Sequence, residues 1–154
     1  MLRSPQGLRS AGQLQVEAKA FVPCPQDKTA VRSWIGAAQA KALDAKNATV
    51  SLGTRFEAAY DAAFFVALAV LNAQGWKGRS VDGHHAFVLE AACSAVGASV
   101  GVFDRLDAVR DIRNQKYAGI ERTASDLQDA KAAFDEFSAA AVQWLQASHA
   151  ALLK

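Results

Sequence analysis

The stretch from residue 104 to residue 119 carries the side chains whose types and spacing are best suited to chemistry. Leu106 and Val109 follow the spacing of one apolar helix face, and Arg113 is the next residue on that face. Arg110 lies three residues before Arg113, so both guanidinium groups project from the same side. Because an inward-facing arginine needs a carboxylate or an anionic ligand, we predict that Arg113 is partly buried beside one.

Two carboxylates at the start of an earlier helix are the candidate partners for these arginines. Glu57 and Asp61 are four residues apart, so they project together from the same helix face. One interpretation is that both are solvated charges that favour the helix dipole. The other is that one of them pairs with Arg110 or Arg113 across the protein, and we place Glu57 first.

His84 and His85 open the helix expected after a glycine-rich loop at 75–83. Adjacent helical residues point about 100° apart, so two such histidines rarely bind one metal ion together. We therefore expect one imidazole to pack at the helix start and the other to face solvent. The chain also lacks a phosphate-binding glycine loop, a GxSxG motif, an HExxH motif and the paired Glu-x-x-His of di-iron bundles. We predict neither a metal nor a cofactor.

The glycine-rich loop itself contains an aromatic and two basic side chains. Trp76, Lys77 and Arg79 could bind a nucleotide by stacking and charge, although such residues more often simply cover a loop. The net charge of the chain is only +2, which is too small to imply bulk electrostatic binding of nucleic acid by itself but leaves a local basic site open.

The composition predicts one all-α domain. The chain has 154 residues, 51% of them hydrophobic and 21% charged, with much alanine and three prolines. All three prolines fall within residues 1–26, which we expect to form a loosely ordered arm outside the core. Residues 27–154 should form an antiparallel, up-down bundle of four to five helices, because long periodic segments are joined by short loops. Cys24 and Cys93 share no motif spacing, so nothing asks for a disulfide.

The helix boundaries follow from caps and breakers. We expect helices over about 27–46, 54–74 and 84–96, with Asp27 capping the first. The helix that carries Arg113 follows a break at 97–101 and should end at Gly119. A last helix should begin at a capping box starting with Ser125 and run to about residue 153.

The segment 54–74 is apolar on every side around its middle. Such a helix is either central in its own fold or covered by another subunit, and we predict a homodimer on this ground. We expect no membrane span, because no apolar run reaches the required length, and no secretory signal, because the N-terminus lacks an apolar core region. A cytoplasmic protein is the expectation.

Four sequence features together resemble the HEPN superfamily over about 28–152. They are Arg-Phe-Glu-Ala-Ala-Tyr-Asp-Ala-Ala at 55–63, Gly-His-His at 83–85, Arg-Asn at 113–114 and Tyr-Ala-Gly at 117–119. The chain is most similar to compact bacterial HEPN-like proteins whose motif ends in tyrosine. The resemblance implies an up-down bundle of four to five helices, commonly a homodimer. It also implies either a metal-independent ribonuclease with an Arg-polar-x(3–5)-His motif or a companion of nucleotidyltransferase domains.

In this resemblance Arg113 matches the motif arginine and Asn114 the polar residue that follows it. Lys116 and Tyr117 stand where the motif histidine would be. The arginine would hold the scissile phosphate, and the histidine would move a proton during attack by the RNA 2′-hydroxyl. Because a tyrosine normally titrates near ~10, Tyr117 is a poor general base at neutral pH. The motif therefore favours phosphate or nucleotide binding over catalysis.

Three hypotheses follow. The first is a dimeric HEPN-like module that binds nucleotide, RNA or a nucleotidyltransferase partner through Arg113, Asn114 and Tyr117, in a cleft near the dimer axis. The second is a ribonuclease of toxin-antitoxin or defence type, in which Tyr117 or one of the 84–85 histidines replaces the motif histidine. The third is a purely structural bundle whose Arg113 sits in an internal salt bridge.

Overall fold

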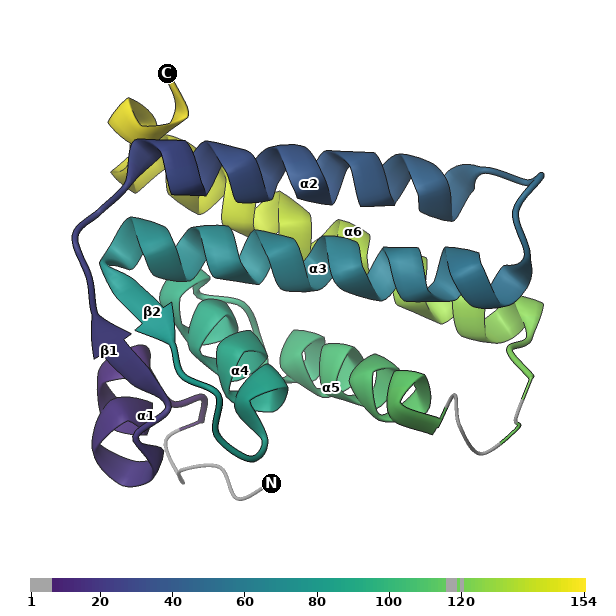
Figure 1. Cartoon of the computed structure of the whole chain (residues 1–154), viewed down its shortest axis with the longest axis horizontal. Coiled ribbons are helices and arrows are strands. Elements are labelled where there is room, and N and C mark those ends of the chain that lie inside the picture. Colours follow the sequence, from purple (N-terminus) through teal and green to yellow (C-terminus); the bar gives the residue numbers. More distant parts are fainter. Residues whose placement is uncertain (1–6, 116–118, 120) are drawn as a thin grey trace.

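The fold was analysed in a computed structural model, which describes residues 7–115, 119 and 121–154. The described chain is mostly helical, with one small two-stranded sheet (Figure 1). The elements in chain order are α1 (Ala11–Ala18), β1 (Phe21–Pro23), α2 (Lys28–Lys46), α3 (Leu52–Gln74), β2 (Trp76–Gly78), α4 (His84–Val96), α5 (Val100–Asn114), α6 (Ala124–Ser148) and the short 3-10 helix η2 (Ala150–Leu153). The predicted all-α class is confirmed.

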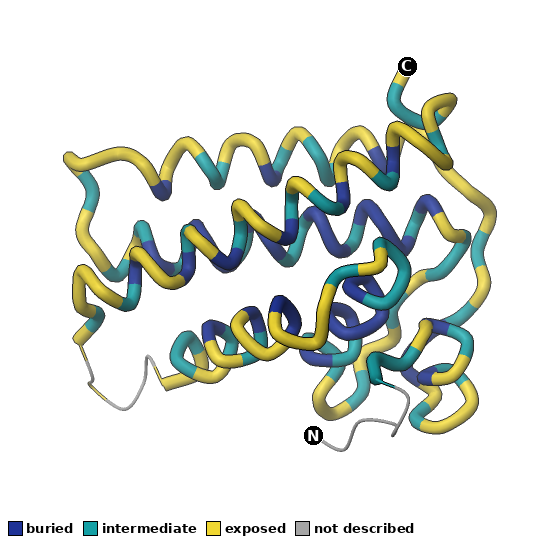
Figure 2. The backbone as a smooth tube through the Cα atoms, turned by 180° about the vertical axis from the view of Figure 1, so that it is seen from behind, coloured by how far each residue is buried: buried dark blue, intermediate teal, exposed yellow. Residues whose placement is uncertain are grey.

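Helix α3 is the central element of the fold. Its largest buried side chains, Phe56, Tyr60 and Leu71, are each no more than 1% exposed. Helix α2 lies alongside it, and α4, α5 and α6 pack against its remaining sides (Figure 1). Seen from behind, the buried backbone concentrates on α3 and α4, while α2 and α6 are buried only where they face inward (Figure 2). Most of the apolar side chains of α3 are therefore buried within one chain.

Local caps set most helix ends. The Asp27 carboxylate accepts a hydrogen bond from the Thr29 amide at 2.9 Å, as predicted for the start of α2. Helix α4 lies between its two cap residues, Gly83 and Gly97, and both have positive φ angles that favour glycine. Helices α2 and α4 have the predicted extents, while α3 begins two residues earlier than predicted.

Three predicted helix ends are wrong. One is the end of α6, which lies at Ser148 and not near residue 153, where the 3-10 helix η2 follows. The other two are the start of α6 and the end of α5. Thr123 and Asp126 form a reciprocal capping box at the start of α6. This capping box begins two residues before Ser125, where it was predicted to begin. Helix α5 ends at Asn114, with Gln115 as its cap residue, and does not reach Gly119. In both cases several polar or glycine residues lie close together, and the sequence alone does not choose between them.

The expectation that residues 1–26 lie outside the core is wrong for the part the structure describes. Leu14 on α1 is fully buried, and Phe21 on β1 is 1% exposed. Strand β1 pairs antiparallel with β2, with Phe21 opposite Gly78. Pro23 sits at the end of this three-residue strand, a position where a missing backbone donor is tolerated. Prolines therefore delimit the segment without excluding it from the core.

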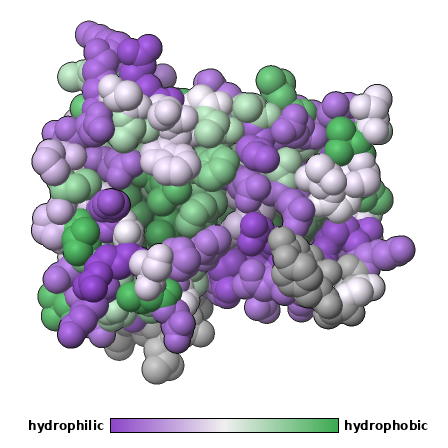
Figure 3. Space-filling model, viewed as in Figure 1, coloured by the Kyte–Doolittle hydropathy of each residue, from purple (hydrophilic) through white to green (hydrophobic). Residues whose placement is uncertain are grey.

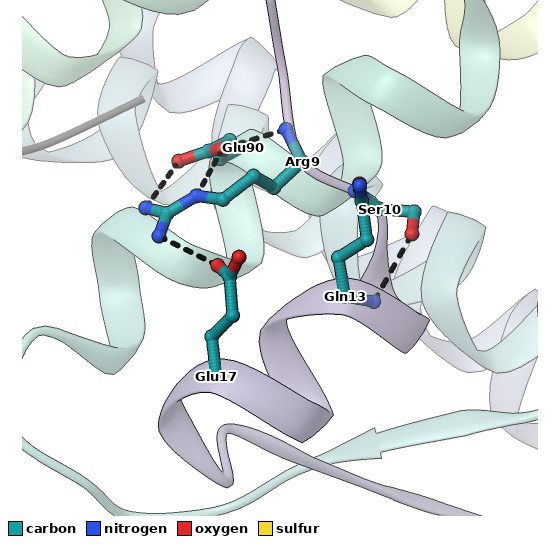
Figure 4. Close-up of polar contacts among 5 residues, drawn as sticks. All are labelled: Arg9, Ser10, Gln13, Glu17 and Glu90. Carbon is teal, nitrogen blue, oxygen red and sulfur yellow. Dashed lines mark hydrogen bonds and ion pairs between the residues drawn. The ribbon is translucent and has the colours of Figure 1, made fainter. Parts of the chain in front are cut away.

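An ion pair also fixes this segment to α4 (Figure 4). The Glu90 side chain is fully buried and accepts three hydrogen bonds from Arg9: 2.7 Å from the backbone N, 2.9 Å from Nε and 3.1 Å from Nη2. Arg9 Nη1 also donates to Glu17 at 3.1 Å. The hydrogen bond with Glu90 raises the pKa of Arg9. Both charges of the pair are thus compensated away from water.

Helix α3 is long and apolar enough to cross a membrane by length and composition alone, contrary to the expectation from the sequence. About 67% of its most apolar stretch is buried inside the protein, and the central helix of a packed core passes the same test. This feature is therefore weak evidence for a membrane span.

Both cysteines, Cys24 and Cys93, are free thiols. Cys93 is buried in the core, and burial raises its pKa to about 12. A thiol in this state carries almost no thiolate at neutral pH, so Cys93 is a small core residue, as its sequence context predicts.

Candidate functional site

The candidate site lies where α3, α4 and α5 meet around Tyr60. Arg113 on α5 has its Nη2 atom 3.9 Å from Asp61 Oδ1 on α3. Its guanidinium carbon stands 5.2 Å from the centre of the Tyr60 ring, in a cation–π arrangement. The Arg113 side chain is 25% exposed, which agrees with the prediction of a partly buried arginine beside a carboxylate. Its Nε atom is buried and has no hydrogen-bond partner among the described residues.

The pairing differs from the first choice made from the sequence. The structure pairs Arg113 with Asp61, one helical turn further along α3 than Glu57. Asp61 also lies 4.0 Å from Lys41 Nζ on α2, so its charge is shared between two cations. Arg110 Nε donates to Asp107 at 2.8 Å on its own helix, instead of crossing to α3. Lys41 and Arg113 together carry two positive charges beside Asp61, which supplies one negative charge.

His85 on α4 completes the cluster. Its Nδ1 lies 3.0 Å from the Tyr60 hydroxyl, in a hydrogen bond whose direction depends on the imidazole tautomer. The ring stacks on Phe64 with centroids 4.3 Å apart, and the His84 ring stands nearly perpendicular to it with centroids 4.5 Å apart. Burial lowers the pKa of His85 to about 4, and the nearby charges of His84, Arg113 and Arg110 act in the same direction. His85 is therefore neutral at pH 7.

Tyr60 is the member of the cluster that the sequence analysis did not single out. It is 1% exposed, and burial raises its pKa well above the usual value for a phenol, with Arg113 and Arg110 partly opposing this. Its hydroxyl stays protonated at any physiological pH and links α3 to the imidazole of α4. The signal for this role was available, because Tyr60 directly precedes Asp61 and belongs to the buried stripe of its helix.

The remaining predicted site residues lie at the edge of this cluster or outside the described part of the chain. Asn114 is exposed at the last position of α5, one residue after Arg113. Lys116 and Tyr117 fall outside the described residues. Among the described residues there is no group of three or more histidine, cysteine and acidic side chains arranged to hold a metal ion.

A cleft adjoins the cluster at Phe64 and His84. Its volume is about 750 Å³, and it opens on the face of the molecule seen in Figure 3, where apolar side chains line a hollow with hydrophilic ones around it. The sequence singled out Lys77, Arg79 and His84 in this region but not the apolar floor. The lining residues are Cys24, Pro25, Gln26, Asp27, Ala30, Trp34, Phe64, Leu68, Asn72, Lys77, Gly78, Arg79, Ser80, His84 and Val88.

Comparison with known proteins adds no relative. No protein-family model matches the chain, and neither the curated proteins nor the solved structures contain a match. The function must therefore be argued from the geometry of the cluster and the cleft.

Proposed function

We propose that this chain is a HEPN-like helical module that binds the phosphate groups of RNA or of nucleotides through Arg113, with Arg110 beside it. The state of the Arg113 guanidinium carries the proposal. It is one quarter exposed, its contact with Asp61 is long at 3.9 Å, and its Nε has no hydrogen-bond partner in the described chain. The long contact with Asp61 leaves the exposed part of the guanidinium available to a ligand, and a guanidinium can bind a phosphate through two donors at once.

Other features support the same proposal. The helical class agrees with the bundle that the HEPN resemblance implies. Arg113 lies at the end of α5, and the exposed Asn114 is the last residue of the same helix. In the proposal Lys116 and Tyr117 extend the site, a second copy of the chain adjoins it, and a nucleotidyltransferase or antitoxin is the candidate protein partner.

Fluorescence anisotropy of a labelled single-stranded RNA of about 20 nucleotides tests the proposal at low salt, where phosphate contacts are strongest. Arg113→Ala should weaken binding about tenfold or more, because it removes a charge-assisted hydrogen-bond donor. Arg113→Lys should fall between, since lysine keeps the charge but loses the fork. The matched control is Arg105→Ala, which removes an exposed cation from the same helix, where it pairs with Glu136. Equal losses in Arg113→Ala and Arg105→Ala would contradict a specific phosphate site.

A metal-independent ribonuclease is the second candidate function, favoured by the neutral imidazole of His85 near Arg113. A neutral imidazole can accept the proton of an RNA 2′-hydroxyl while an arginine holds the phosphate under attack. The lowered pKa makes His85 a weak base, so we expect slow cleavage at most.

Cleavage of the same RNA in excess EDTA tests this activity. His85→Gln and Arg113→Ala should each abolish it, whereas His149→Gln, which removes an imidazole just after the end of α6, should not. Cleavage that survives in both variants would assign it to a contaminant. Binding without cleavage would leave the first proposal in place and exclude the second.

A purely structural bundle is the third candidate, and the ion pair between Arg113 and Asp61 taken alone favours it. In that case Asp61→Asn and Arg113→Ala should lower thermal stability, and the wild-type chain should bind no RNA. Thermal unfolding measured beside the anisotropy assay distinguishes this outcome from the other two.

A further inference from the structure

The cleft between α2, α3 and β2 is a second candidate site, separate from the Arg113 cluster. Its volume of about 750 Å³ lies within the range of small-molecule sites. It is walled on one side by residues just before and within α2, and on the other by β2, the residues after it and the start of α4. Figure 3 shows it as a hollow in an otherwise mostly hydrophilic face.

The floor of the cleft is apolar and held in place by its neighbours. Trp34 packs on Phe65 with ring centroids 5.3 Å apart, and its Nε1 donates to the Asn72 side-chain oxygen at 3.0 Å when that amide also donates to the Trp76 carbonyl. Phe64 is held in place by its stacking on the imidazole of His85. Trp34, Phe64 and Leu68 form a partly exposed surface suited to a flat apolar group.

The polar side of the cleft is cationic. Lys77 and Arg79 are exposed, and neither has an ion pair within the described part of the chain. His84 lies on the same side, at the start of α4. The one carboxylate in the lining, that of Asp27, is engaged by the Thr29 amide as a helix cap. Lys77 and Arg79 therefore give the cleft two positive charges that form no ion pair among the described residues, against the single negative charge of Asp27.

We propose that this cleft binds a small amphiphilic anion, with a flat aromatic body on Trp34, Phe64 and Leu68 and its negative group at Lys77 and Arg79. The apolar floor alone would accept any apolar molecule, and the two unpaired cations select those with a negative group at one end. The proposal does not depend on phosphate binding by Arg113, because the two sites use different cations.

Two fluorescent probes that differ by one charged group test the proposal on the full chain. They are 8-anilinonaphthalene-1-sulfonate and N-phenyl-1-naphthylamine, which has the same aromatic body without the sulfonate. The sulfonate probe should bind the wild-type protein at one site. The double variant Lys77→Gln/Arg79→Gln should raise its Kd about tenfold and leave the Kd of the neutral probe unchanged.

Control variants distinguish binding in this cleft from binding elsewhere on the protein. Lys46→Gln/Lys131→Gln removes the same charge at distant positions and should leave both Kd values unchanged. Leu68→Trp fills the floor and should weaken both probes together. Equal Kd values of the sulfonate probe in the wild type and in Lys77→Gln/Arg79→Gln would overturn the proposal, as would failure of Leu68→Trp to affect either probe. Circular dichroism on each variant checks that it is folded.

Discussion

His85 shows how the surroundings of one side chain change its chemistry in this protein. Its imidazole stacks on Phe64 and contacts the Tyr60 hydroxyl, and two arginines lie nearby. Burial and positive charge both disfavour the imidazolium, so the pKa falls to about 4 from an ordinary value of 6.5. In the proposed site, an anion bound to these arginines would offset their charge and raise this pKa again.

The lowered pKa of His85 predicts a pH-dependent stability. Below pH 6.5 the unfolded chain binds a proton at this histidine and the folded chain does not, until the pH falls to about 4. The free energy of unfolding should therefore drop as the pH falls through this window, by about 1–2 kcal/mol after allowance for solvent screening. Urea unfolding at about pH 7 and at about pH 4.5 measures this drop, because these two pH values span most of the window. His85→Gln should show a smaller drop than the wild type, and equal drops would contradict the assignment.

The N-terminal segment shows how one ion pair can hold an element in place. Arg9 and Glu90 come from segments 81 residues apart, and the carboxylate of Glu90 is fully buried. A buried pair of this kind contributes little relative to an apolar pair, but removing one partner leaves an uncompensated charge. The arginine thus makes the packing of α1 on α4 specific.

Arg9→Ala should destabilise the protein by about 3–5 kcal/mol, because it strands the Glu90 carboxylate in the core. The double variant Arg9→Met/Glu90→Met should recover most of this loss, since it leaves no unpaired charge. Glu17→Gln should have an effect below about 1 kcal/mol, because Glu17 is half exposed. Chemical denaturation of the three variants measures these values. A double variant as unstable as Arg9→Ala would show that the loss has another source.

Two glycines that end helices offer a matched comparison of backbone constraints. Gly75 ends α3 and Gly97 ends α4, with φ angles of 85° and 73°. A Cβ added at Gly75 would lie 3.1 Å from the backbone oxygen of Cys24, whereas at Gly97 it would meet open space. Gly97→Ala should therefore cost about 1 kcal/mol, and Gly75→Ala about 2 kcal/mol or more. Thermal unfolding of both variants tests the order, and the reverse order would refute the steric argument.

The whole molecule is a helical core to which the N-terminal segment contributes directly. Leu14 and Phe21 are buried with the residues of α3 and α4, and β1 completes a sheet with β2 beside the cleft. The predicted homodimer stays a prediction. The argument for a dimer from the apolar surface of α3 is weaker in the structure. Most of that surface is covered within one chain, and part of the remainder lines the cleft.

Deletion of residues 1–26 should unfold most of the protein, in contrast to the expectation for a loose arm. It removes the buried Leu14 and Phe21 side chains, each worth about 2–3 kcal/mol, and leaves Glu90 without Arg9. The sum is comparable to the total stability of a typical domain, about 5–15 kcal/mol. Circular dichroism and denaturant unfolding of the truncated chain measure this. A cooperative transition close to that of the full chain would contradict the prediction.

The sequence by itself determined where α2, α3 and α4 lie to within two residues, because their ends depend on local chemistry. Asp27 caps α2 and Gly97 ends α4 through contacts within a few residues, and the spacing of apolar residues marked the buried faces. The same spacing correctly placed Arg113 partly buried beside a carboxylate. Local rules were insufficient where capping residues crowd together, as at Thr123 and Ser125.

The tertiary structure alone decided which distant residues meet. Glu57 and Asp61 are equivalent by spacing, and only the position of α5 against α3 selects Asp61 for Arg113. Arg9 joins Glu90, and β1 joins β2, although nothing in either local sequence marks its partner. The cleft depends on residues from α2, α3, β2 and α4 together. Periodicity fixes which face of an element is buried, whereas contacts between faces depend on how the elements pack, which no single segment encodes.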